Sequence, residues 1–417
     1  MARTVHIVGA GLAGLASAVR LAARGVATVV HEATDQAGGR CRSYYDAATA
    51  MRIDNGTHIL LSGNNAALAF LADVGAGARV TGAPAARYPF VDLATNERWT
   101  LDLGAGRLSP WMFDPRRRAP GTRAIDYLPL IRLLWPAHGK TLGEIMPCSG
   151  PAYERVVRPF LLAALNIDPR EGSSDLARAV VLETIAAGGQ ACRPYLAPQG
   201  LSVAFVEPAI EFLRSRGGVV AFARQLRRLV VDGSRVCGLD FGDSITAVGP
   251  EAAVVLAVPP YAAGGLVPGL QTPDQYRAII NAHFRLSPPD IAPMIGVVNG
   301  VAEWVFAFDD RISVTISDAG RLLELSRDQI AQMIWQDVQR VTGITTALPP
   351  WQLVRERRAT FAATPGQNAR RPAAVTAWRN LVLAGDWTAT GLPATIEGAV
   401  RSGNRAADLI LQERSRP

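Results

Sequence analysis

The hydrophobic residues at the start of the chain change from a strand pattern to a helix pattern across a glycine-rich turn. Residues 5–8 form a short, largely β-branched apolar run, and the glycines that follow are spaced Gly-x-Gly-x-x-Gly: Gly9, Gly11 and Gly14. Apolar residues then recur at helical spacing to about Arg24, Gly25 ends this stretch, and a second apolar run covers residues 28–31. The pattern predicts a strand, a tight turn, a helix and a second strand, the order found in dinucleotide-binding βαβ units.

Each position of this turn has a physical role at a phosphate. Gly9 permits the tight turn, Gly11 lets the backbone approach a pyrophosphate, and Gly14 lets the helix and the strand pack closely. The first helical residues, Leu12 and Ala13, present backbone N–H groups at the positive end of the helix dipole. We therefore predict that this turn binds the pyrophosphate of a dinucleotide.

The residues after the second strand extend the predicted site. Glu32, with Ala33 beside it, lies about 20 residues beyond the turn, where a carboxylate can accept hydrogen bonds from a ribose. Gly38, Gly39 and Arg40 form a second glycine turn. Next to the first turn, we expect it to wrap the far side of the dinucleotide, with Arg40 near the phosphates. The alternative is a surface turn with a solvated arginine.

A similar turn lies near the other end of the chain. An apolar run ends at residues 385–386 and is followed by a Gly/Pro loop and by a helix that opens on small residues near 394. The residues expected at a cofactor here are Gly385, Asp386, Pro393, Ala394, Thr395 and Ile396. Two such turns are expected if one long cofactor, FAD, spans both. Asp386 would then lie at its ribityl and phosphate region and the helix N-terminus at its flavin end.

The middle of the chain supplies a third piece. Residues 218–241 have the pattern of strands with a turn at residues 232–233, and residues 252–260 are a buried strand that ends in two prolines. We expect the backbone near Leu226 to contact adenine. The predicted fold is α/β, with a discontinuous Rossmann-like FAD-binding domain and an inserted α+β substrate-binding domain. The first comprises residues 1–75, 196–260 and 370–417, and the second comprises residues 76–195 and 261–369.

Composition and charge narrow the class of protein. The formal net charge is +7, and it comes almost entirely from arginine, since Lys140 is the only lysine. Such a chain favours anionic surfaces, but it contains no nucleic-acid module, so we expect no nucleic-acid partner. The cysteines lack paired spacing, which argues against disulfides and a metal site and fits a cytoplasmic protein. Neither a transmembrane helix nor a signal peptide is expected.

Four stretches carry a resemblance to a known family. They are "DNGTHILLSG" (54–63), "RPFLLAALNIDP" (158–169), "RERRATFAATPG" (355–366) and "LAGDWTATGLPATIEGAVRSG" (383–403). The chain resembles the FAD-dependent amine oxidase and carotene desaturase superfamily, and within it the squalene-associated branch, the hydroxysqualene dehydroxylases of hopanoid synthesis. The likeness runs from end to end. His31, where an apolar or small residue is more usual, departs from it, and we expect no functional consequence.

The resemblance implies a reaction. The hydroxyl of hydroxysqualene is allylic, so its loss leaves a delocalised cation that hydride from N5 of reduced FAD converts to squalene. The protein would supply an apolar cavity, a proton donor and electrons from an unidentified donor. The rival readings are a polyene desaturase, an amine oxidase and a non-catalytic isoprenoid-binding flavoprotein. Amine oxidases usually place a lysine at the flavin, whereas we expect Lys140 far from it.

Three side chains are candidates for catalysis. His58 is the first, because a pKa near neutrality suits a general acid; the alternative is a histidine bonded to backbone. Asp54, with Asn55, Gly56 and Thr57, is expected mainly to support the flavin. Glu397 could act near the flavin, or could be a first-turn carboxylate favoured by the helix dipole. The remaining histidines, His6, His138 and His283, are interpreted as incidental.

An apolar, basic stretch over residues 107–136 is the candidate for membrane docking. A C30 polyene is nearly insoluble in water, at about 0.8 kcal/mol per CH₂, so the enzyme should collect it at the inner face of the cytoplasmic membrane. The alternative is a set of helices packed on the substrate domain with solvated arginines. The docking residues we expect are Trp111, Met112, Phe113, Leu128, Leu130, Ile131, Leu133, Leu134 and Trp135, with Arg107, Arg116, Arg117, Arg118, Arg123 and Arg132.

Overall fold

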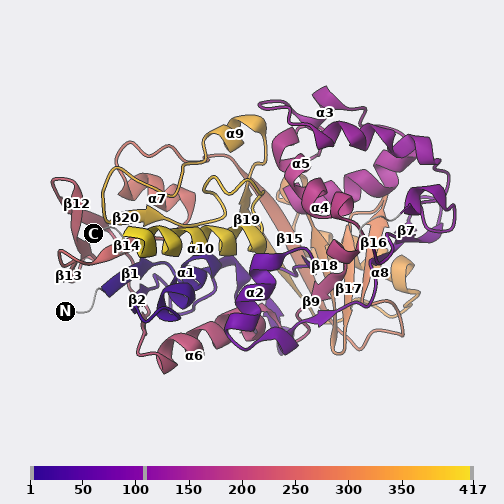
Figure 1. The fold of residues 1–417 in the computed structure, drawn as a ribbon. Helices are drawn as coiled ribbons and strands as arrows, with labels where there is room; N and C mark the ends of the chain where they lie inside the picture. Colours follow the sequence, from indigo (N-terminus) through magenta and orange to yellow (C-terminus); the bar gives the residue numbers. More distant parts are fainter. Residues whose placement is uncertain (1–3, 107–109, 414–417) are drawn as a thin grey trace.

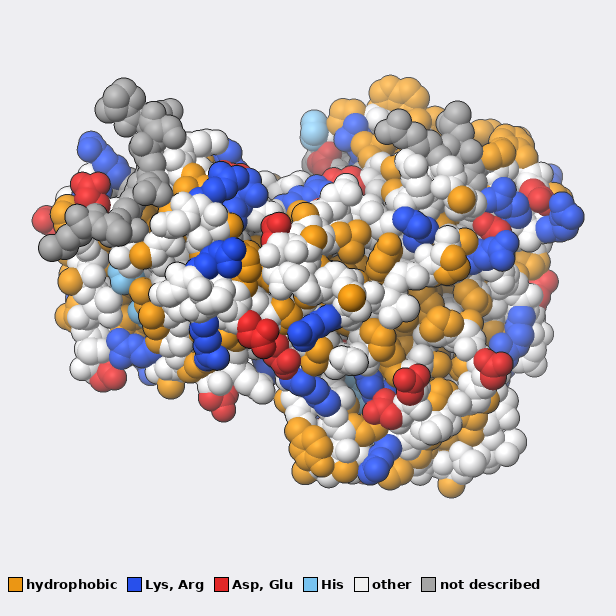
Figure 2. Space-filling view, turned by 60° about the horizontal axis from the view of Figure 1, so that its bottom comes forward, with side chains coloured by type: hydrophobic (Ala, Val, Ile, Leu, Met, Phe, Trp, Pro, Cys, Tyr) orange, Lys and Arg blue, Asp and Glu red, His pale blue; other side chains and the backbone are white. Residues whose placement is uncertain are grey.

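A computed structural model describes residues 4–106 and 110–413. The chain builds two lobes on two large sheets. The parallel sheet and α10 form the lobe on the left in Figure 1, and the larger sheet forms the lobe on the right. After the domains predicted for them, we call these the cofactor lobe and the substrate lobe. Figure 2 shows the lobes from another side, with a notch between them at the upper margin. The predicted α/β class and the amine oxidase type of fold are confirmed.

The first sheet is parallel throughout and has five strands. Their order is β10 (Val219–Ala221), β2 (Ala27–His31), β1 (Thr4–Val8), β14 (Ala253–Leu256) and β20 (Leu381–Leu383). The central strands are almost continuously apolar, because helices cover both faces of such a sheet. Strands from three distant parts of the sequence therefore share one sheet, as expected for a discontinuous cofactor-binding unit.

Two long helices follow the strands at the two ends of the chain. α1 (Leu12–Ala22) and α10 (Ile396–Glu413) pack directly on each other. A Cβ at Gly403 would lie 2.2 Å from the carbonyl oxygen of Ala13, so this glycine permits the close crossing. Further along, Arg20 donates to Asp408 at 2.7 and 3.0 Å. The first helix ends slightly before the predicted Arg24.

The second sheet has seven strands. Their order is β19 (Trp351–Phe361), β15 (Tyr276–Arg285), β18 (Arg311–Ile316), β17 (Trp304–Phe308), β16 (Met294–Val298), β7 (Arg87–Asp92) and β8 (Arg98–Asp102). One face packs on α8 (Arg327–Thr342). The other face carries a cluster of large apolar side chains that we call the aromatic layer: Tyr88, Phe90, Trp99, Trp111, Tyr127, Val156, Trp304 and Phe306, with the half-buried Ile59, Leu61 and Leu130 at its margin.

Shorter elements complete the two lobes. The small strands are β3 (Ser43–Asp46), β4 (Met51–Asp54), β5 (Leu60–Leu61), β6 (Thr81–Gly82), β9 (Pro194–Leu196), β11 (Arg228–Asp232), β12 (Arg235–Asp240) and β13 (Ile245–Ala247). The remaining α-helices are α2 (Asn65–Asp73), α3 (Leu142–Ile145), α4 (Arg158–Leu165), α5 (Ser174–Glu183), α6 (Glu207–Ser215), α7 (Pro260–Leu266) and α9 (Pro365–Ala369). Within the described ranges, no helix is long and apolar enough to cross a membrane.

Candidate cofactor and substrate site

The first glycine turn combines two crowded positions with one open position. Gly9 has φ +105°, and a Cβ there would lie 2.5 Å from the carbonyl oxygen of Ala257. A Cβ at Gly14 would lie 1.9 Å from the carbonyl oxygen of Gly9. Gly11, in contrast, has no atom within 4 Å of its Cβ position. The open space lies at the N-terminus of α1, where the first helical N–H groups lack intrahelical partners, so this position fits a pyrophosphate.

Glu32 lies beside this turn. Its carboxylate accepts a hydrogen bond from the backbone N–H of Ala10 at 2.8 Å, and its second oxygen accepts from the N–H and the hydroxyl of Thr34. It stays half-buried, next to the exposed Ala33, as a ribose-binding carboxylate must. The position predicted for Glu32 is therefore compatible with binding the adenosine half of a dinucleotide.

Residues 221–224 supply the backbone that borders Glu32. The N–H of Glu32 donates to Ala221 O at 2.8 Å, and the N–H of Arg224 donates to Glu32 O at 2.7 Å. Ala223 adopts a left-handed conformation, and its N–H donates to Thr34 O. Leu226, the predicted adenine neighbour, is buried in the hydrophobic core. The contact of the backbone near Leu226 with adenine stays a prediction.

The second glycine turn packs directly on the first. The N–H of Gly38 donates to Ala10 O at 2.8 Å, and Gly38 forms a parallel bridge with Gly11. A Cβ at Gly39 would lie 3.4 Å from Gly11 Cα. The two turns therefore form one continuous backbone surface.

Arg40 connects the two ends of the chain. Its guanidinium donates to both carboxylate oxygens of Asp386 at 2.7 Å and to the carbonyl oxygen of Ala359 at 2.5 Å. β1 and β20 are both parallel neighbours of β14, so the turns that follow them lie at the same edge of the sheet. The two predicted phosphate-binding turns thus border one site.

The turn after β20 is held by side chains. The buried Arg371 donates to the carbonyl oxygens of Asp386 at 3.0 Å and Thr388 at 2.5 Å, and to the hydroxyl of Thr390 at 2.8 Å. Burial lowers the pKa of Arg371 to about 10, so it remains charged at neutral pH. The sequence reasoning missed this arginine, because no motif distinguishes it from the other arginines nearby.

The N-terminus of α10 lies as predicted. The hydroxyl of Thr395 accepts a hydrogen bond from the N–H of Gly398 at 3.0 Å, which caps the helix. Pro393 and Ile396 are buried and Ala394 is half-buried. The N–H of Gly385 donates to the hydroxyl of Ser402 at 2.9 Å, which fixes the turn to the second turn of the same helix.

The segment 54–57 is held from β15 by Asn281. The amide of Asn281 donates to Asn55 O at 3.3 Å and accepts from the N–H of Thr57 at 3.4 Å. A Cβ at Gly56 would lie 2.9 Å from the same amide, so glycine is required for this approach. Thr315 on β18 donates to Asn281 at 2.8 Å and fixes its orientation. Sequence reasoning missed Asn281, which lies in an ordinary strand without a motif.

The interpretation of His283 as incidental is wrong. Its Nε2 lies 3.0 Å from Asp54 O, and its Nδ1 lies 2.8 Å from the hydroxyl of Ser313. Burial lowers the pKa of His283 to about 4, so the ring is neutral, with Nε2–H donating to Asp54 O and Nδ1 accepting from Ser313. Its role is to position the backbone that leads to His58.

The carboxylate of Asp54 has a structural environment. It is buried and accepts from the hydroxyl of Ser43 at 2.5 Å and from the N–H of Leu201 at 2.8 Å. Burial raises the pKa of Asp54, although both of these bonds act against that rise. These contacts tie the 54–58 segment to the start of the helical stretch at residues 201–215, in agreement with a supporting role.

His58 is half-buried and makes no hydrogen bond to any residue that the structure describes. Burial, and after it the charge of Arg40, lower the pKa of His58 to about 4. The expectation of a pKa near neutrality is therefore not met. At pH 7 the imidazole is neutral, with both ring nitrogens available to a ligand.

Glu397 lies in a network that stabilises two helices. Its buried carboxylate accepts from the N–H groups of Ala66 at 3.1 Å and Ala67 at 2.8 Å, which caps α2. Arg401 donates to it at 2.7 Å. Glu397 lies in the first turn of α10, as in the predicted structural alternative, but the N–H groups that it accepts from belong to the neighbouring helix α2.

Glu303 is a titratable residue in the substrate lobe that no sequence motif indicates. Glu303 precedes β17, accepts from the N–H of Ser317 at 2.8 Å, and lines a small polar cavity with Arg158 and Arg321. Burial raises the pKa of Glu303 to about 7. Its backbone N–H donates to Thr315 O, so it is one strand away from the residue that orients Asn281.

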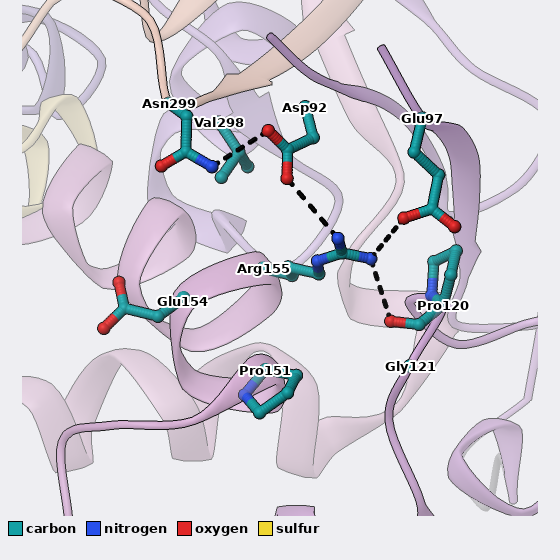
Figure 3. A pocket seen from close by; sticks show the side chains of 9 residues that line it. All are labelled: Asp92, Glu97, Pro120, Gly121, Pro151, Glu154, Arg155, Val298 and Asn299. Carbon is teal, nitrogen blue, oxygen red and sulfur yellow. Dashed lines mark hydrogen bonds and ion pairs between the residues drawn. The ribbon is translucent and has the colours of Figure 1, made fainter. Parts of the chain in front are cut away.

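The pocket in Figure 3 lies in the substrate lobe, and Arg155 pairs there with the carboxylates of Asp92 and Glu97. It measures about 420 Å³. Arg155 donates to Glu97 at 2.6 Å, to Pro120 O at 3.0 Å and to the buried Asp92 at 3.4 Å, and Asn299 donates to Asp92 at 2.9 Å. We interpret this pocket as structural. In the described ranges, no cluster of histidine, cysteine or acidic residues could hold a metal ion.

Comparison with known proteins agrees with this geometry. Residues 12–287 and 305–411 match the family described as flavin containing amine oxidoreductase. The chain is 57% identical to the hydroxysqualene dehydroxylase of Rhodopseudomonas palustris and 54% identical to that of Sinorhizobium fredii, over 99% of each chain. Among solved structures, a putative protoporphyrinogen oxidase from Exiguobacterium is similar with a TM-score of 0.70 at 16% identity, over 99% of both chains. At that identity the likeness shows the fold alone.

Proposed function

This chain belongs to the hydroxysqualene dehydroxylase family within the flavin-containing amine oxidoreductases, and from that premise we propose that it reductively removes the allylic hydroxyl of hydroxysqualene to give squalene. The observation that carries the proposal is the identity of 45–57% to three relatives of that name, over 97–99% of this chain. The fold is shared with amine oxidases, so it does not by itself choose among the reactions of the family.

The geometry supports FAD as the flavin. The open position at Gly11 and the carboxylate of Glu32 fit a pyrophosphate and a ribose. The N-terminus of α10 and the segment 54–57 fit the flavin end, and Arg40 with Asp386 lie between the two halves. A bound flavin supplies the two-electron reduction that replaces the hydroxyl by hydrogen. Acid precipitation of the protein should release free FAD; FMN in the supernatant, or a flavin that stays in the precipitate, would contradict this assignment.

We propose that His58 binds the departing hydroxyl and provides its proton. Its ring nitrogens have no partner among the described residues, and Asn281 and His283 fix the backbone beside it. Because its pKa lies near 4, only a small fraction is protonated at neutral pH. If that fraction carries the reaction, kcat/KM should rise about tenfold for each pH unit from 7 to 5.

Variants distinguish His58 from other proton donors. His58→Ala should retain the flavin, slow turnover by about 10²-fold, and remove the rise at low pH. Glu303→Gln is the comparison variant, because a donor with a pKa near 7 would give a profile that levels off below neutrality. An unchanged rate and profile in His58→Ala would return that residue to a structural role.

The decisive experiment for the reaction itself uses two substrates under anaerobic conditions. Photoreduced protein incubated with hydroxysqualene should form squalene together with oxidised flavin. Oxidised protein incubated with phytoene should show no flavin reduction. The Gly11→Val variant, depleted of flavin, controls for conversion without the cofactor. Flavin reduction by phytoene, with no squalene from hydroxysqualene, would favour the desaturase reading.

We further propose that the protein acts in the cytoplasm, peripherally at the inner face of the cytoplasmic membrane. Its hydrocarbon substrate partitions into lipid, which supports collection there. The electrons come from a donor that reaches the flavin from outside the chain. Cell fractionation of the untagged protein tests the location, and recovery of the protein in the soluble fraction alone, at low salt, would contradict it.

A further inference from the structure

The 3₁₀ helix η4 (Ala124–Leu134) exposes one apolar row along its length. Ile125, Leu128, Ile131 and Leu134 occur at every third position and are 42–60% exposed. A 3₁₀ helix has three residues per turn, so residues three apart lie on the same face. All four side chains therefore point outward together.

The opposite side of η4 is firmly packed. Tyr127 and Leu133 are buried, and the ring of Tyr127 meets Trp111 edge-on at 4.9 Å. The hydroxyl of Tyr127 also lies 3.0 Å from that of Thr122. The helix is thus anchored on the substrate lobe, and the outward row is a fixed surface.

Two exposed aromatic side chains lie near this row, one directly after η4 and one in a short helix that contacts η4. Trp135 directly follows η4 and is 63% exposed, and Phe113 in the short helix η3 (Trp111–Phe113) is 70% exposed. We call these two residues and the four of the row the outward apolar face. Trp side chains are favoured at the boundary between lipid headgroups and acyl chains, because their rings are apolar and carry one polar group.

The described arginines of this region differ in their partners. Arg116 and Arg123 have highly exposed side chains, and each is paired only with a nearby acidic residue. Arg118 donates to the carbonyl oxygens of Thr122 and Met112, so it holds the loop together. The docking stretch predicted over 107–136 is therefore corrected: Trp111 and Leu133 are buried, Leu130 packs on the aromatic layer, and Arg107 lies outside the described residues. Like Arg118, Arg117 and Arg132 donate to backbone carbonyl oxygens, of Asp102 and Ile145 respectively.

We propose that the outward apolar face inserts into the boundary of an anionic lipid bilayer. The exposed arginines at its edge complement anionic headgroups, and a single row of aliphatic side chains suits shallow insertion. This inference rests on the proposed function, since a membrane-dissolved substrate gives such a face its purpose. The lobe that carries it is the right-hand one in Figures 1 and 2.

The same helix connects the face to the interior. Tyr127 and Leu130, on the inner side of η4, belong to the aromatic layer, whose margin includes Ile59. Ile59 directly follows His58. The apolar packing of the substrate lobe is therefore continuous from η4 to the residue beside the proposed reaction site.

Flotation with vesicles tests the docking directly. The double variant Leu128→Ser, Ile131→Ser should bind phosphatidylcholine–phosphatidylglycerol vesicles at least about tenfold more weakly than wild type. The matched control is Val231→Ser, Ile245→Ser, because these residues are similarly exposed on the small sheet of β11–β13 in the cofactor lobe. The control should bind like wild type. Wild-type protein that ignores the vesicles, or a double variant that binds as well as wild type, would overturn the proposal.

The charge contribution is tested separately. Arg116→Ala, Arg123→Ala should weaken binding a few-fold on vesicles with phosphatidylglycerol and little on vesicles without it, and the difference should shrink as salt is raised. Equal weakening on both vesicles would show that the arginines act through packing, and would remove the anionic lipid from the proposal.

Activity separates this inference from the proposed reaction. The Leu128→Ser, Ile131→Ser variant should convert detergent-dissolved hydroxysqualene normally and lose most of its turnover with vesicle-dissolved substrate. If wild type binds vesicles but forms no squalene in detergent, the proposed reaction fails and the docking stands. Light scattering tests whether a second copy of the chain covers this face instead. If the wild-type protein is a dimer and the double variant is a monomer, a second copy covers the face and membrane docking is overturned.

Discussion

The two turns that border the proposed cofactor site lie at one edge of one sheet, yet they are built differently. In the first, after β1, glycines determine the shape. Gly9 and Gly14 permit close backbone contacts that any side chain would block, and Gly11 leaves open space. In the second, after β20, Gly385 also excludes a side chain, since a Cβ there would lie 2.3 Å from Trp387 Nε1, but Arg371 and Ser402 from other elements bond to the turn as well. The first turn therefore depends mainly on glycines at fixed spacing, whereas the second also depends on side chains from other elements.

This difference explains why only the first turn has a compact sequence signature. A turn made by glycines depends on spacing along a few consecutive residues, so the sequence shows it directly. A turn made by side chains depends on residues that reach it from other elements. Because the two turns are built differently, we expect them to respond differently to substitution.

The largest effect is expected at Gly14. In Gly14→Val the new Cβ would meet the carbonyl oxygen of Gly9 at 1.9 Å, so strand and helix must separate. We expect the free energy of unfolding to fall by about 3 kcal/mol and flavin binding to be lost. Urea denaturation and flavin absorbance measure the two effects. Gly366→Ala, where a Cβ meets nothing within 4 Å, is the control, and a Gly14→Val protein of normal stability would refute the packing argument.

At Gly11 we expect loss of flavin without loss of the fold. The position has room for a side chain in the protein itself, so Gly11→Val should melt within about 2 °C of the wild-type apoprotein. The same side chain would fill the space at the N-terminus of α1 and exclude a pyrophosphate. Calorimetry of both apoproteins and titration with FAD provide the measurement. If Gly11→Val binds FAD normally, the open space is not the phosphate site.

The second turn should respond to the loss of one side chain. Arg371→Met removes the donor to two carbonyl oxygens and a hydroxyl, so we expect a destabilisation of about 2–3 kcal/mol and weaker flavin binding. Arg370→Met is the matched control, because Arg370 is next to Arg371 in the sequence, is more exposed, and forms its bonds outside this turn. Equal effects of the two substitutions would mean that the second turn does not depend on Arg371.

The same contrast explains which features of the fold and the site could be predicted from the sequence. Strand, turn and helix at each end were predictable, because strands, glycines and helix starts leave local patterns. The Arg40–Asp386 pair was not, since it depends on β14 placing two distant strands side by side. Asn281 and His283 were missed for a related reason: they lie in an ordinary strand and act only through the segment that folds against it.

Burial has a further consequence that no residue pattern contains. The sequence gives His58 an ordinary histidine pKa, whereas the structure lowers it to about 4 through burial and Arg40. The outward row of η4 could not be predicted from the sequence either. In an α-helix, Leu128 and Leu134 would lie on different faces. Only the three-residue period of the 3₁₀ helix aligns them.

The smallest expected effect is on acid stability, and it also separates the two turns. His31, directly before Glu32, is buried and stacked on His6, and burial lowers the pKa of His31 to about 4. The second turn and its helix, residues 383–403, contain no histidine.

A histidine with a lowered pKa in the folded state takes up its proton in the unfolded chain first, so stability is complete above pH 6.5 and falls as the pH drops toward 4. From pH 6.5 to 5, before most carboxylates titrate, we expect His31 to contribute about 1 kcal/mol of destabilisation per pH unit. Urea unfolding across this window should show a smaller slope in His31→Asn than in wild type. An unchanged slope in His31→Asn would show that the ring is protonated in the folded protein, and that the end of β2 tolerates a charge that its burial argues against.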